Sequence, residues 1–197
     1  MGLIGQAVLH TARYLLGLDT AATQTSPRER EAIARFARGR RQALEIGVFE
    51  GATTALIAKE IAPDATLFAV DPFFPGRLGI CWGKMIAERE VSRTAGARKV
   101  VFLRCLSHDA VSQIANDFDF IFLDGDHSLA AIAQDWTDWS VRVVPGGVML
   151  LHDTQIPAHN PRVGELGSYR YFHEIISRDP RFEILETVDS LSVLRRT

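Results

Sequence analysis

The sequence is poor in cysteine and has no long, uninterrupted apolar run. Its two cysteines, Cys81 and Cys105, are too few for a disulfide framework, so we expect a protein of the reducing cytoplasm. The first seventeen residues are largely apolar, but His10 and Arg13 interrupt them. They also lack a basic start and a small-residue cleavage site, which argues against a signal peptide and a membrane span. We therefore expect no membrane partner.

An excess of positive charge is absent as well. The formal net charge is −2 and the basic residues are scattered, so no positive stripe could follow a phosphate backbone. We expect no nucleic-acid partner. A chain of 197 residues with 47% hydrophobic content can bury one sizeable core. The prediction is a single domain over residues 1–197.

Residues 1–25 are predicted to form a helical appendage to that domain. The apolar residues that recur there at helical spacing are Ile4, Val8, Ala12 and Leu15, with Leu9 and Leu16 beside them. Packing on the core is the simplest use of this helix. The alternatives are a lid over a substrate and a contact with a second copy, which would make a homodimer.

A second helix is expected from Ser26 onward. Ser26-Pro27-Arg28-Glu29 combines a capping box with proline at the first helical position, and Gly39 suits the helix end. After Arg41, short apolar runs alternate with helical patterns, which is typical of a parallel sheet with crossover helices. The runs are 43–48, 66–70, 100–106, 118–123 and 148–151, and two closing runs, 182–187 and 190–194, should pair as an antiparallel hairpin. The predicted fold class is α/β, Rossmann-like and doubly wound, with a mostly parallel seven-stranded sheet and a C-terminal antiparallel hairpin.

A glycine loop, Glu45-Ile46-Gly47-Val48-Phe49-Glu50-Gly51, follows the first strand and opens a helix. The nicotinamide fingerprint places a glycine at its middle position so that a pyrophosphate can approach. Here that position is Phe49, and the acidic Glu50 follows it. The bulk of Phe49 and the negative charge of Glu50 both oppose a pyrophosphate. A ligand with a cationic sulfonium and an amino-acid tail would not meet the same repulsion. Glu45 is difficult to explain as a core residue because an unpaired buried carboxylate is costly.

Asp71 follows the second strand, at the place where a ribose diol is usually held by an acidic side chain. A turn or cap role would explain Asp71 alone. With the glycine loop, the chain resembles class I S-adenosylmethionine-dependent methyltransferases, whose first motif is approximately E-x-G-x-G-x-G. Phe49 departs from that motif. The resemblance implies that Glu45, Gly47, Phe49, Gly51, Asp71 and Asp124 bind S-adenosylmethionine, with Ser107 near the adenine.

Polar side chains also follow the fourth and fifth strands, as Asp124-Gly125-Asp126-His127-Ser128 and His152-Asp153-Thr154. Both sets leave a parallel sheet at its carboxyl edge, beside the glycine loop. They predict a metal site, a proton relay, or both. The competing interpretation is that Asp124 and Asp126 cap the next helix, for which Ser128 would also serve, and that His152 is a satisfied buried residue.

Within the superfamily, residues 43–153 resemble small-molecule O-methyltransferases that carry D-G-D-H-S and H-D-T motifs. Methyl transfer to a hydroxyl requires loss of its proton, and His127 suits the base because imidazole titrates near neutral pH. Metal-dependent relatives bind Mg²⁺ through the first aspartate and an acidic pair after the fifth strand. That resemblance implies Mg²⁺ or another divalent cation at Asp124 and Asp153, with His152 as a further ligand or just outside.

The sequence therefore predicts methyl transfer from S-adenosylmethionine to a hydroxyl of a small molecule of sugar, phenol or polyketide type. The apolar connection 72–84, with Phe73, Phe74 and Trp82, would cover a flat acceptor or pack locally. A nicotinamide-dependent Rossmann oxidoreductase is the alternative enzyme class, but it lacks the second glycine and a Tyr-x-x-x-Lys pair. A non-catalytic S-adenosylmethionine-binding protein would leave the acidic and histidine residues without a role.

Overall fold

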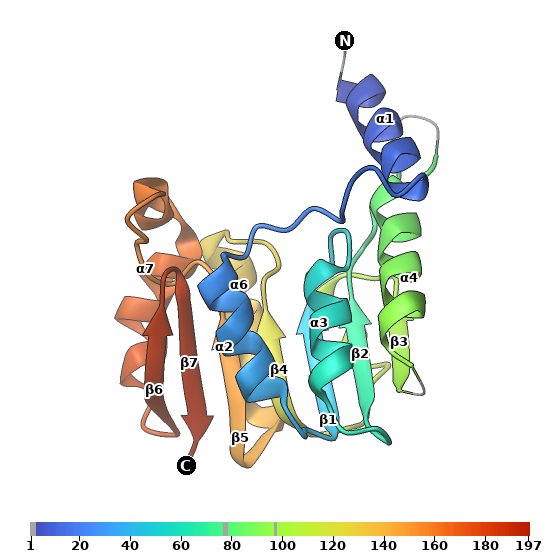
Figure 1. Ribbon diagram of the computed structural model, residues 1–197. Coiled ribbons are helices and arrows are strands. Elements are labelled where there is room, and N and C mark those ends of the chain that lie inside the picture. The colour runs from blue at the N-terminus through green and yellow to red at the C-terminus, as the bar shows by residue number, and fades with distance from the viewer. Residues whose placement is uncertain (1–2, 77–78, 97) are drawn as a thin grey trace.

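A computed structural model describes residues 3–76, 79–96 and 98–197. Its seven strands form one sheet in the order β3-β2-β1-β4-β5-β7-β6 (Figure 1). Strands β1 to β5 are parallel, whereas β7 is antiparallel to both β5 and β6. This topology confirms the predicted doubly wound sheet with its C-terminal hairpin. The strands are β1 (Gln42–Ile46), β2 (Thr66–Val70), β3 (Lys99–Leu103), β4 (Phe118–Leu123), β5 (Val143–Leu151), β6 (Phe182–Val188) and β7 (Leu191–Arg196).

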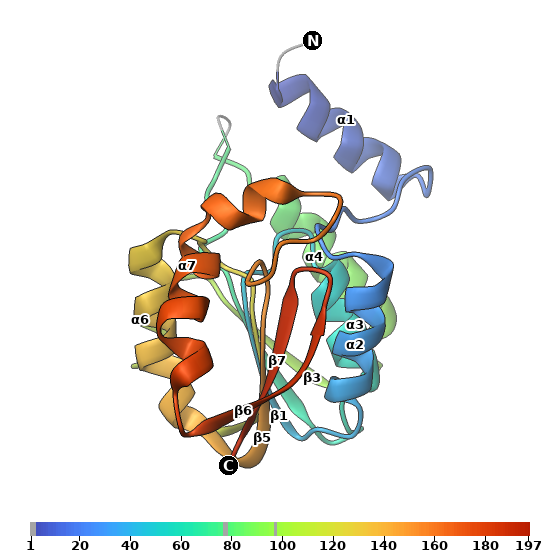
Figure 2. The same ribbon diagram turned by 90° about the vertical axis from the view of Figure 1, so that its left-hand side faces the viewer.

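Helices cover both faces of the sheet, so the molecule has three layers (Figure 2). Helices α2, α3 and α4 lie on one face, and α6 and α7 lie on the other. Helix α1 stands beyond the carboxyl edge of the parallel strands, at one end of α4 (Figure 1). The helices are α1 (Leu3–Leu15), α2 (Pro27–Ala37), α3 (Ala52–Glu60), α4 (Trp82–Thr94), α5 (Ser107–Ala110), α6 (Leu129–Trp139) and α7 (Gly167–Glu174).

Alternation along each strand divides the core between the two faces. Ala43 packs with Ile33 and Ile57 beneath α2 and α3, while the next residue, Leu44, packs with Trp136 beneath α6. The central strands are therefore apolar on both sides, as strands of a covered parallel sheet must be. Ile132, Trp136 and Trp139 recur at helical spacing along α6 and are buried, but Leu129 at the start of this helix is exposed.

Strand β5 begins earlier than the apolar run 148–151 predicts, because it continues through Pro145-Gly146-Gly147. These residues lie inside β5, which begins at Val143, and the register between Phe118 and Phe120 shifts there. Phe118 pairs with Val143 and Phe120 pairs with Val148, so the intervening β5 residues bulge out of the ladder. A bulge accommodates proline and glycine without ending the strand. The sequence signal was a local irregularity and not the end of the element.

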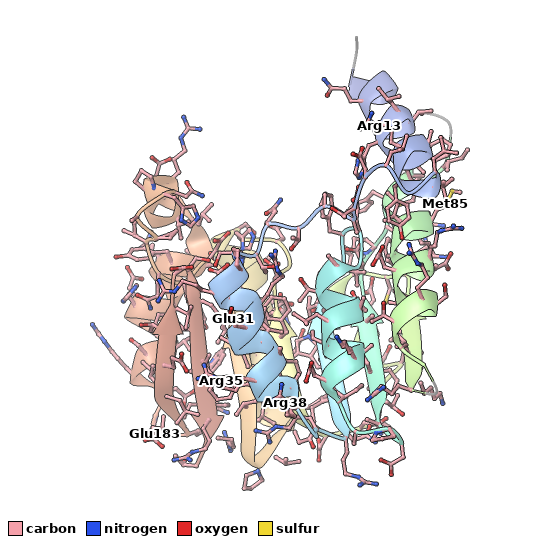
Figure 3. All side chains as sticks on the ribbon, in the orientation of Figure 1. Arg13, Glu31, Arg35, Arg38, Met85 and Glu183 are labelled. Carbon is pink, nitrogen blue, oxygen red and sulfur yellow. The ribbon has the colours of Figure 1, made fainter. Side chains whose placement is uncertain are left out.

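Helix α2 begins as its sequence predicts. The Ser26 side chain accepts a hydrogen bond from the Glu29 backbone N–H, and the Glu29 carboxylate accepts one from the Ser26 backbone N–H, which completes a capping box. Arg35, Arg38 and Glu31 lie on the outer side of α2, away from the sheet (Figure 3). This start fixes Glu29 at the carboxyl edge of the sheet, facing inward.

The buried face of α1 differs from the one that the apolar pattern predicts. Thr11 and Tyr14 are buried, and the Tyr14 hydroxyl donates a hydrogen bond of 2.6 Å to Glu90 on α4. Val8, Leu9, Leu15 and Leu16 are exposed instead. Ala12 is exposed too, and the side chain of Ile4 lies outside the described residues. A polar anchor to α4, which meets α1 near Met85 (Figure 3), holds the helix without burying its leucines in the core.

None of the described helices is long and apolar enough to cross a membrane.

Candidate active site

A cavity of about 790 Å³ opens at the carboxyl ends of β1, β2 and β4. The strand order reverses between β1 and β4, because β2 and β3 lie on one side of β1 and β5 lies beyond β4. Ligands of open α/β sheets bind at such a switch point. Gly47, Phe49, Asp71, Ser107 and Asp124, all predicted cofactor residues, line this cavity, and so does His127.

Tight backbone conformations shape the glycine loop. Gly47, Phe49 and Gly51 have φ values of 90°, 54° and 76°. A Cβ atom on Gly47 would lie 2.0 Å from the backbone oxygen of Asp124, and one on Gly51 would lie 2.7 Å from the Cα of Ala87. The two glycines thus let the loop pack against the β4 turn and helix α4. Gly51 does so without lining the cavity.

The Asp71 carboxylate stabilises this loop through hydrogen bonds to its backbone. Its Oδ2 accepts hydrogen bonds from the backbone N–H groups of Val48 (2.9 Å) and Phe49 (3.1 Å), and its Oδ1 accepts one from Phe73 (2.7 Å). Each carboxylate oxygen can accept more than one hydrogen bond, so capacity remains for a ligand. Asp71 therefore orders the loop and also faces the cavity.

Glu45 lies beneath the cavity and not on its wall. Its side chain is fully buried, and neither carboxyl oxygen has a hydrogen-bond partner among the described residues. Burial raises the pKa of Glu45 well above its usual range, and the negative charges of Asp124 and Asp71 act in the same direction. Both effects favour the neutral form of this carboxyl group.

The N-terminal segment supplies one wall of the cavity. No motif in the sequence marks the individual residues that form this wall. Ala22, Thr23 and Gln24 line it. Glu50 of the glycine loop ties this segment down, because its Oε2 accepts a hydrogen bond from the Ala22 N–H (2.6 Å) and lies 3.0 Å from His10 Nε2. The hydrogen bond to Glu50 raises the pKa of His10.

Ser107 marks the opposite end of the cavity. Its Oγ accepts a hydrogen bond from Trp139 Nε1 (2.8 Å), and Asp135 of α6 lines the same region. Burial raises the pKa of Asp135 to about 6, against a hydrogen bond from Ser107 that lowers it. A buried carboxylate on a cavity wall is a candidate binding group. No sequence motif marks Asp135, because it occupies an ordinary position in an amphipathic helix.

The predicted acidic and histidine residues do converge. His127 Nε2 lies 3.4 Å from Asp153 Oδ2 and 3.8 Å from Asp124 Oδ1, while His152 Nδ1 lies 3.0 Å from Asp124 Oδ1 and 3.6 Å from Asp153 Oδ1. One ligand atom each from Asp124, His127 and His152 falls within 4.8 Å of the others. Asp153 lies beside this group, within 3.4 Å of His127 and 3.6 Å of His152, so the set of Asp124, His152 and Asp153 stays a prediction.

The helix cap that the competing interpretation expected is Ser128 and not Asp124. Ser128 is the N-cap of α6, and its Oγ accepts a hydrogen bond from Ala131 N–H. Asp126 accepts a hydrogen bond from the Ser128 N–H and so shapes the turn. The structure gives Asp124 no capping role, and its side chain faces His152 instead.

Ser168, at the start of α7, joins the two turns that carry these residues. Its backbone N–H donates to the carbonyl oxygen of His127 (3.1 Å), and its Oγ donates to the carbonyl oxygen of Asp153 (2.8 Å). Asp153 has a φ of 53°, a conformation that L residues adopt at some energetic cost. The clamp from Ser168 supports that conformation.

Glu29 reaches the same cluster from α2. Its Oε2 lies 3.4 Å from His152 Nε2, and its Oε1 accepts hydrogen bonds from Ser190 N–H (2.8 Å) and Ser190 Oγ (2.7 Å). Burial alone would lower the pKa of His152, but the neighbouring carboxylates of Asp124 and Glu29 outweigh it and raise that pKa to about 10. The sequence marked Glu29 only as half of a capping box.

Proteins of known structure share this fold. An O-methyltransferase from Bacillus cereus in complex with SAH superposes with a TM-score of 0.65 over 97% of this chain and 91% of its own, at 20% identity. TomG, an O-methyltransferase from Streptomyces achromogenes in complex with SAM, does so with a TM-score of 0.65 over 98% and 88%, also at 20% identity. Both likenesses concern the fold.

Sequence comparison gives the family. Tapetum-specific methyltransferase 1 of Arabidopsis thaliana is 28% identical over 170 residues, which cover 78% of this chain and 68% of that protein. A sequence-family model described as "Methyltransferase domain" matches residues 44–154, more than half of the 197 residues. The matched residues run from within β1 to the turn after β5 and contain the glycine loop and both polar turns. The chain therefore belongs to this methyltransferase-domain family, as its sequence predicts.

Proposed function

We propose that the protein transfers a methyl group from S-adenosylmethionine to a hydroxyl of a small molecule of sugar, phenol or polyketide type, with help from a divalent metal. The observation that carries the proposal is the position of His127. It lines the cavity at the end of β4, with Asp124 and Asp153 beside its ring. An imidazole next to two carboxylates is suited to take a proton from a hydroxyl.

The cavity wall supports the choice of cofactor. S-adenosylmethionine supplies a methyl group activated by its sulfonium charge. Asp71 would accept hydrogen bonds from the ribose hydroxyls, Ser107 and Asp135 would lie toward the adenine, and Gly47 and Phe49 would pack against the middle of the molecule. The Bacillus cereus and Streptomyces achromogenes proteins of similar fold hold SAH and SAM, which makes the same ligand a reasonable expectation here.

His127 would act on the acceptor. The hydroxyl proton passes to a ring nitrogen of His127 as the oxygen forms its new bond to the methyl carbon and the carbon–sulfur bond breaks. Asp153, 3.4 Å from Nε2, orients the ring and stabilises the cation that results. Orientation of the acceptor beside the methyl group supplies much of the remaining acceleration.

The residues present fit a divalent metal. His152 Nδ1 is buried and has no hydrogen-bond partner among the described residues, although it faces Asp124 and Asp153. Asp124, His152 and Asp153 would hold the ion. A bound divalent ion would orient the acceptor oxygen and favour its ionised form. Nitrogen donors in the set favour Mn²⁺, Fe²⁺, Co²⁺ or Zn²⁺ over Mg²⁺.

The cavity has walls that would cover an acceptor. Phe73 and Phe74 line it, with Phe73 buried and Phe74 largely exposed. The segment 22–24 closes the side nearest to α1. We propose that residues 1–25 serve as a lid in this sense, because Glu50 connects that segment directly to the glycine loop.

The rival functions have less support. A nicotinamide oxidoreductase would require a pyrophosphate to approach Phe49, whose side chain is half exposed at the cavity wall beside Glu50. Membership of a methyltransferase family also disfavours it. A binding protein without catalysis would need no base, which leaves His127 and its two carboxylates unexplained.

Calorimetric titration tests the cofactor. S-adenosylhomocysteine should bind, NAD should not, and failure of the former to bind would refute the proposal. A panel of hydroxylated sugars, phenols and polyketides, with radiolabelled methyl donor, then identifies the acceptor class. Activity that survives removal of divalent ions by a chelator would count against metal assistance.

The replacement His127→Ala separates two roles for that residue. A base is needed for turnover only, so the variant should keep S-adenosylhomocysteine and metal affinity and lose activity. Loss of metal binding would instead make His127 a ligand, as its distance to Asp124 and His152 allows. Unchanged activity would show that it is neither.

A further inference from the structure

Glu29 is a buried carboxylate that the capping box does not fully explain. A capping box requires one carboxylate oxygen to accept a hydrogen bond from the Ser26 N–H, and Oε2 does so at 2.7 Å. Residues at this helical position are usually at the surface, but Glu29 is 2% exposed. Burial of a charge is costly unless it is paired and hydrogen-bonded. The other partners of the carboxylate therefore show what its position is used for.

Those partners connect three segments that are distant in the sequence. Oε1 of Glu29 accepts two hydrogen bonds from Ser190, in the turn between β6 and β7. Oε2 faces His152 Nε2, in the turn after β5. The N-terminus of α2 is docked on the same hairpin turn, because Ser26 Oγ donates to Asp189 at 2.6 Å. Glu29 is thus fixed on the side of His152 that faces away from Asp124.

The two nitrogens of His152 consequently differ in their surroundings. Nε2 lies 3.4 Å from Glu29 Oε2, whereas Nδ1 is buried, has no hydrogen-bond partner in the part of the chain that the structure describes, and lies 3.0 Å from Asp124 Oδ1. Histidine ligands to metals commonly donate their other ring N–H to a carboxylate, which fixes the tautomer and the ring orientation. The arrangement of Glu29, His152 and Asp124 has this form.

We propose that Glu29 is a positioning residue, which keeps a proton of His152 on Nε2, so that a divalent metal at Asp124 would take the place of the Nδ1 proton and bind that nitrogen. The inference rests on the proposed metal assistance. It adds to the site a residue from α2, outside the segment 44–154 that the methyltransferase family covers. A metal bound at this site is thereby linked to the docking of α2 and of the β6–β7 turn.

The test measures metal binding and not only turnover. Co²⁺ is titrated into the full-length protein, freed of metal beforehand, and followed by calorimetry and by visible absorption, whose intensity and position report nitrogen ligation. Glu29→Gln keeps the shape of the side chain but offers one acceptor oxygen in place of two and bears no charge. We expect it to bind Co²⁺ about 10- to 100-fold more weakly and with an altered spectrum.

Ser26→Ala is the matched control. It removes the other half of the same capping box and the bond to Asp189, but it leaves the Glu29 carboxylate beside His152. We expect its melting temperature to fall while Co²⁺ affinity and spectrum stay those of the unmodified protein. A purely structural role for Glu29 would give both variants the same pattern, with lower stability and unchanged Co²⁺ binding, and would overturn the inference.

The remaining outcomes are also decisive. If the unmodified protein binds no Co²⁺, metal assistance fails and the role of Glu29 fails with it. If the unmodified protein binds Co²⁺ and Glu29→Gln binds it equally well, only the role of Glu29 fails. Should Glu29→Gln not fold, Ser190→Ala removes one donor that fixes the carboxylate, and a several-fold loss of Co²⁺ affinity is expected. Unchanged affinity in Ser190→Ala would then count against the inference.

Discussion

Asp135 offers a quantitative test of how the cavity is built. It lies on α6 at the cavity wall and is 6% exposed. Its pKa is raised from 3.8 to about 6, first by burial and also by the charges of Asp138 and Asp126, while a hydrogen bond from Ser107 opposes the shift. Asp135→Asn removes the charge and keeps an oxygen that can accept the bond from Ser107.

The sign of the effect follows from linkage. The folded state binds the Asp135 proton more tightly than the unfolded state does. The favourable contribution of the protonated Asp135 carboxyl group to the free energy of folding is therefore complete below pH 3.8 and is lost as the pH rises through about 6. A shift of about 2 pKa units corresponds to about 3 kcal/mol at 1.36 kcal/mol per unit. The ionised Asp135 therefore destabilises the protein by about 3 kcal/mol at pH 8. At pH 5 the same calculation gives about half of that value.

Urea unfolding at pH 5 and pH 8 measures this difference. Asp135→Asn should be more stable than the unmodified protein by about 3 kcal/mol at pH 8 and by about half as much at pH 5. Asp138→Asn on the same helix removes one of the charges that raise the pKa of Asp135 and also a pair with the exposed His108, so it should give a smaller gain at pH 8 than Asp135→Asn. An equal gain for Asp135→Asn at both pH values, or a loss at pH 8, would refute the electrostatic explanation.

The cost of Asp135 suggests a role in binding. Proteins retain destabilising groups where function requires them. The carboxylate can accept a hydrogen bond from an amino group such as that of adenine, so Asp135→Asn should bind S-adenosylhomocysteine more weakly while it is more stable. A variant that gains stability and keeps full affinity would show that Asp135 does not contact the cofactor.

Four further predictions concern the loop, the lid, the turns and the appendage. Gly47→Ala should lose cofactor binding and about 3 kcal/mol in urea unfolding, since its Cβ would meet the oxygen of Asp124, whereas Gly39→Ala, with a similar φ and open space, should lose only about 1–2 kcal/mol. Hydrogen bonding to Glu50 raises the pKa of His10. The stabilising contribution of the protonated His10 imidazole to folding is therefore present below pH 6.5 and is lost as the pH rises through the raised pKa. His10→Ala should therefore lower the melting temperature at pH 6 and not at pH 9. Ser168→Ala, which frees the carbonyl of Asp153, should cost about 1–2 kcal/mol in urea unfolding and reduce kcat more than cofactor affinity. If the exposed leucines of α1 join two copies, Leu16→Glu should convert a dimer to a monomer in light scattering, and a monomeric unmodified protein would contradict that expectation.

Local sequence signals sufficed for the elements whose causes are local. The boundaries of β2 and β4 match their apolar runs, and Ser26 starts α2 because a capping box involves only four neighbouring residues. The face of α1 was mispredicted because its contact with α4 depends on one polar anchor, Tyr14, and not on its apolar stripe. Glycine and proline at 145–147 interrupt the apolar pattern ahead of residue 148, and only the pairing with β4 shows that they form a bulge inside β5.

The candidate site shows the same division. Parallel strands place Asp124, His127, His152 and Asp153 at one edge, and that much follows from the order of strands and motifs. The partners that orient them come from elsewhere in the chain: Glu29 from α2 and Ser168 from α7. Neither carries a motif for this role, because a single glutamate or serine acquires it only through packing. Asp135 was missed for the same reason.

Asp124 joins the cofactor side of the site to the acceptor side. Its backbone N–H donates to the carbonyl oxygen of Ile46, its own carbonyl oxygen packs on Gly47, and its side chain faces His152. A shift of this one residue would move the glycine loop and the acidic cluster together. Loss of activity in Asp124→Asn therefore cannot be assigned to either side by kinetics alone. Because Asn preserves the backbone contacts, S-adenosylhomocysteine affinity should change little while Co²⁺ affinity falls, and an equal loss of both would mean that the side chain itself holds the cofactor.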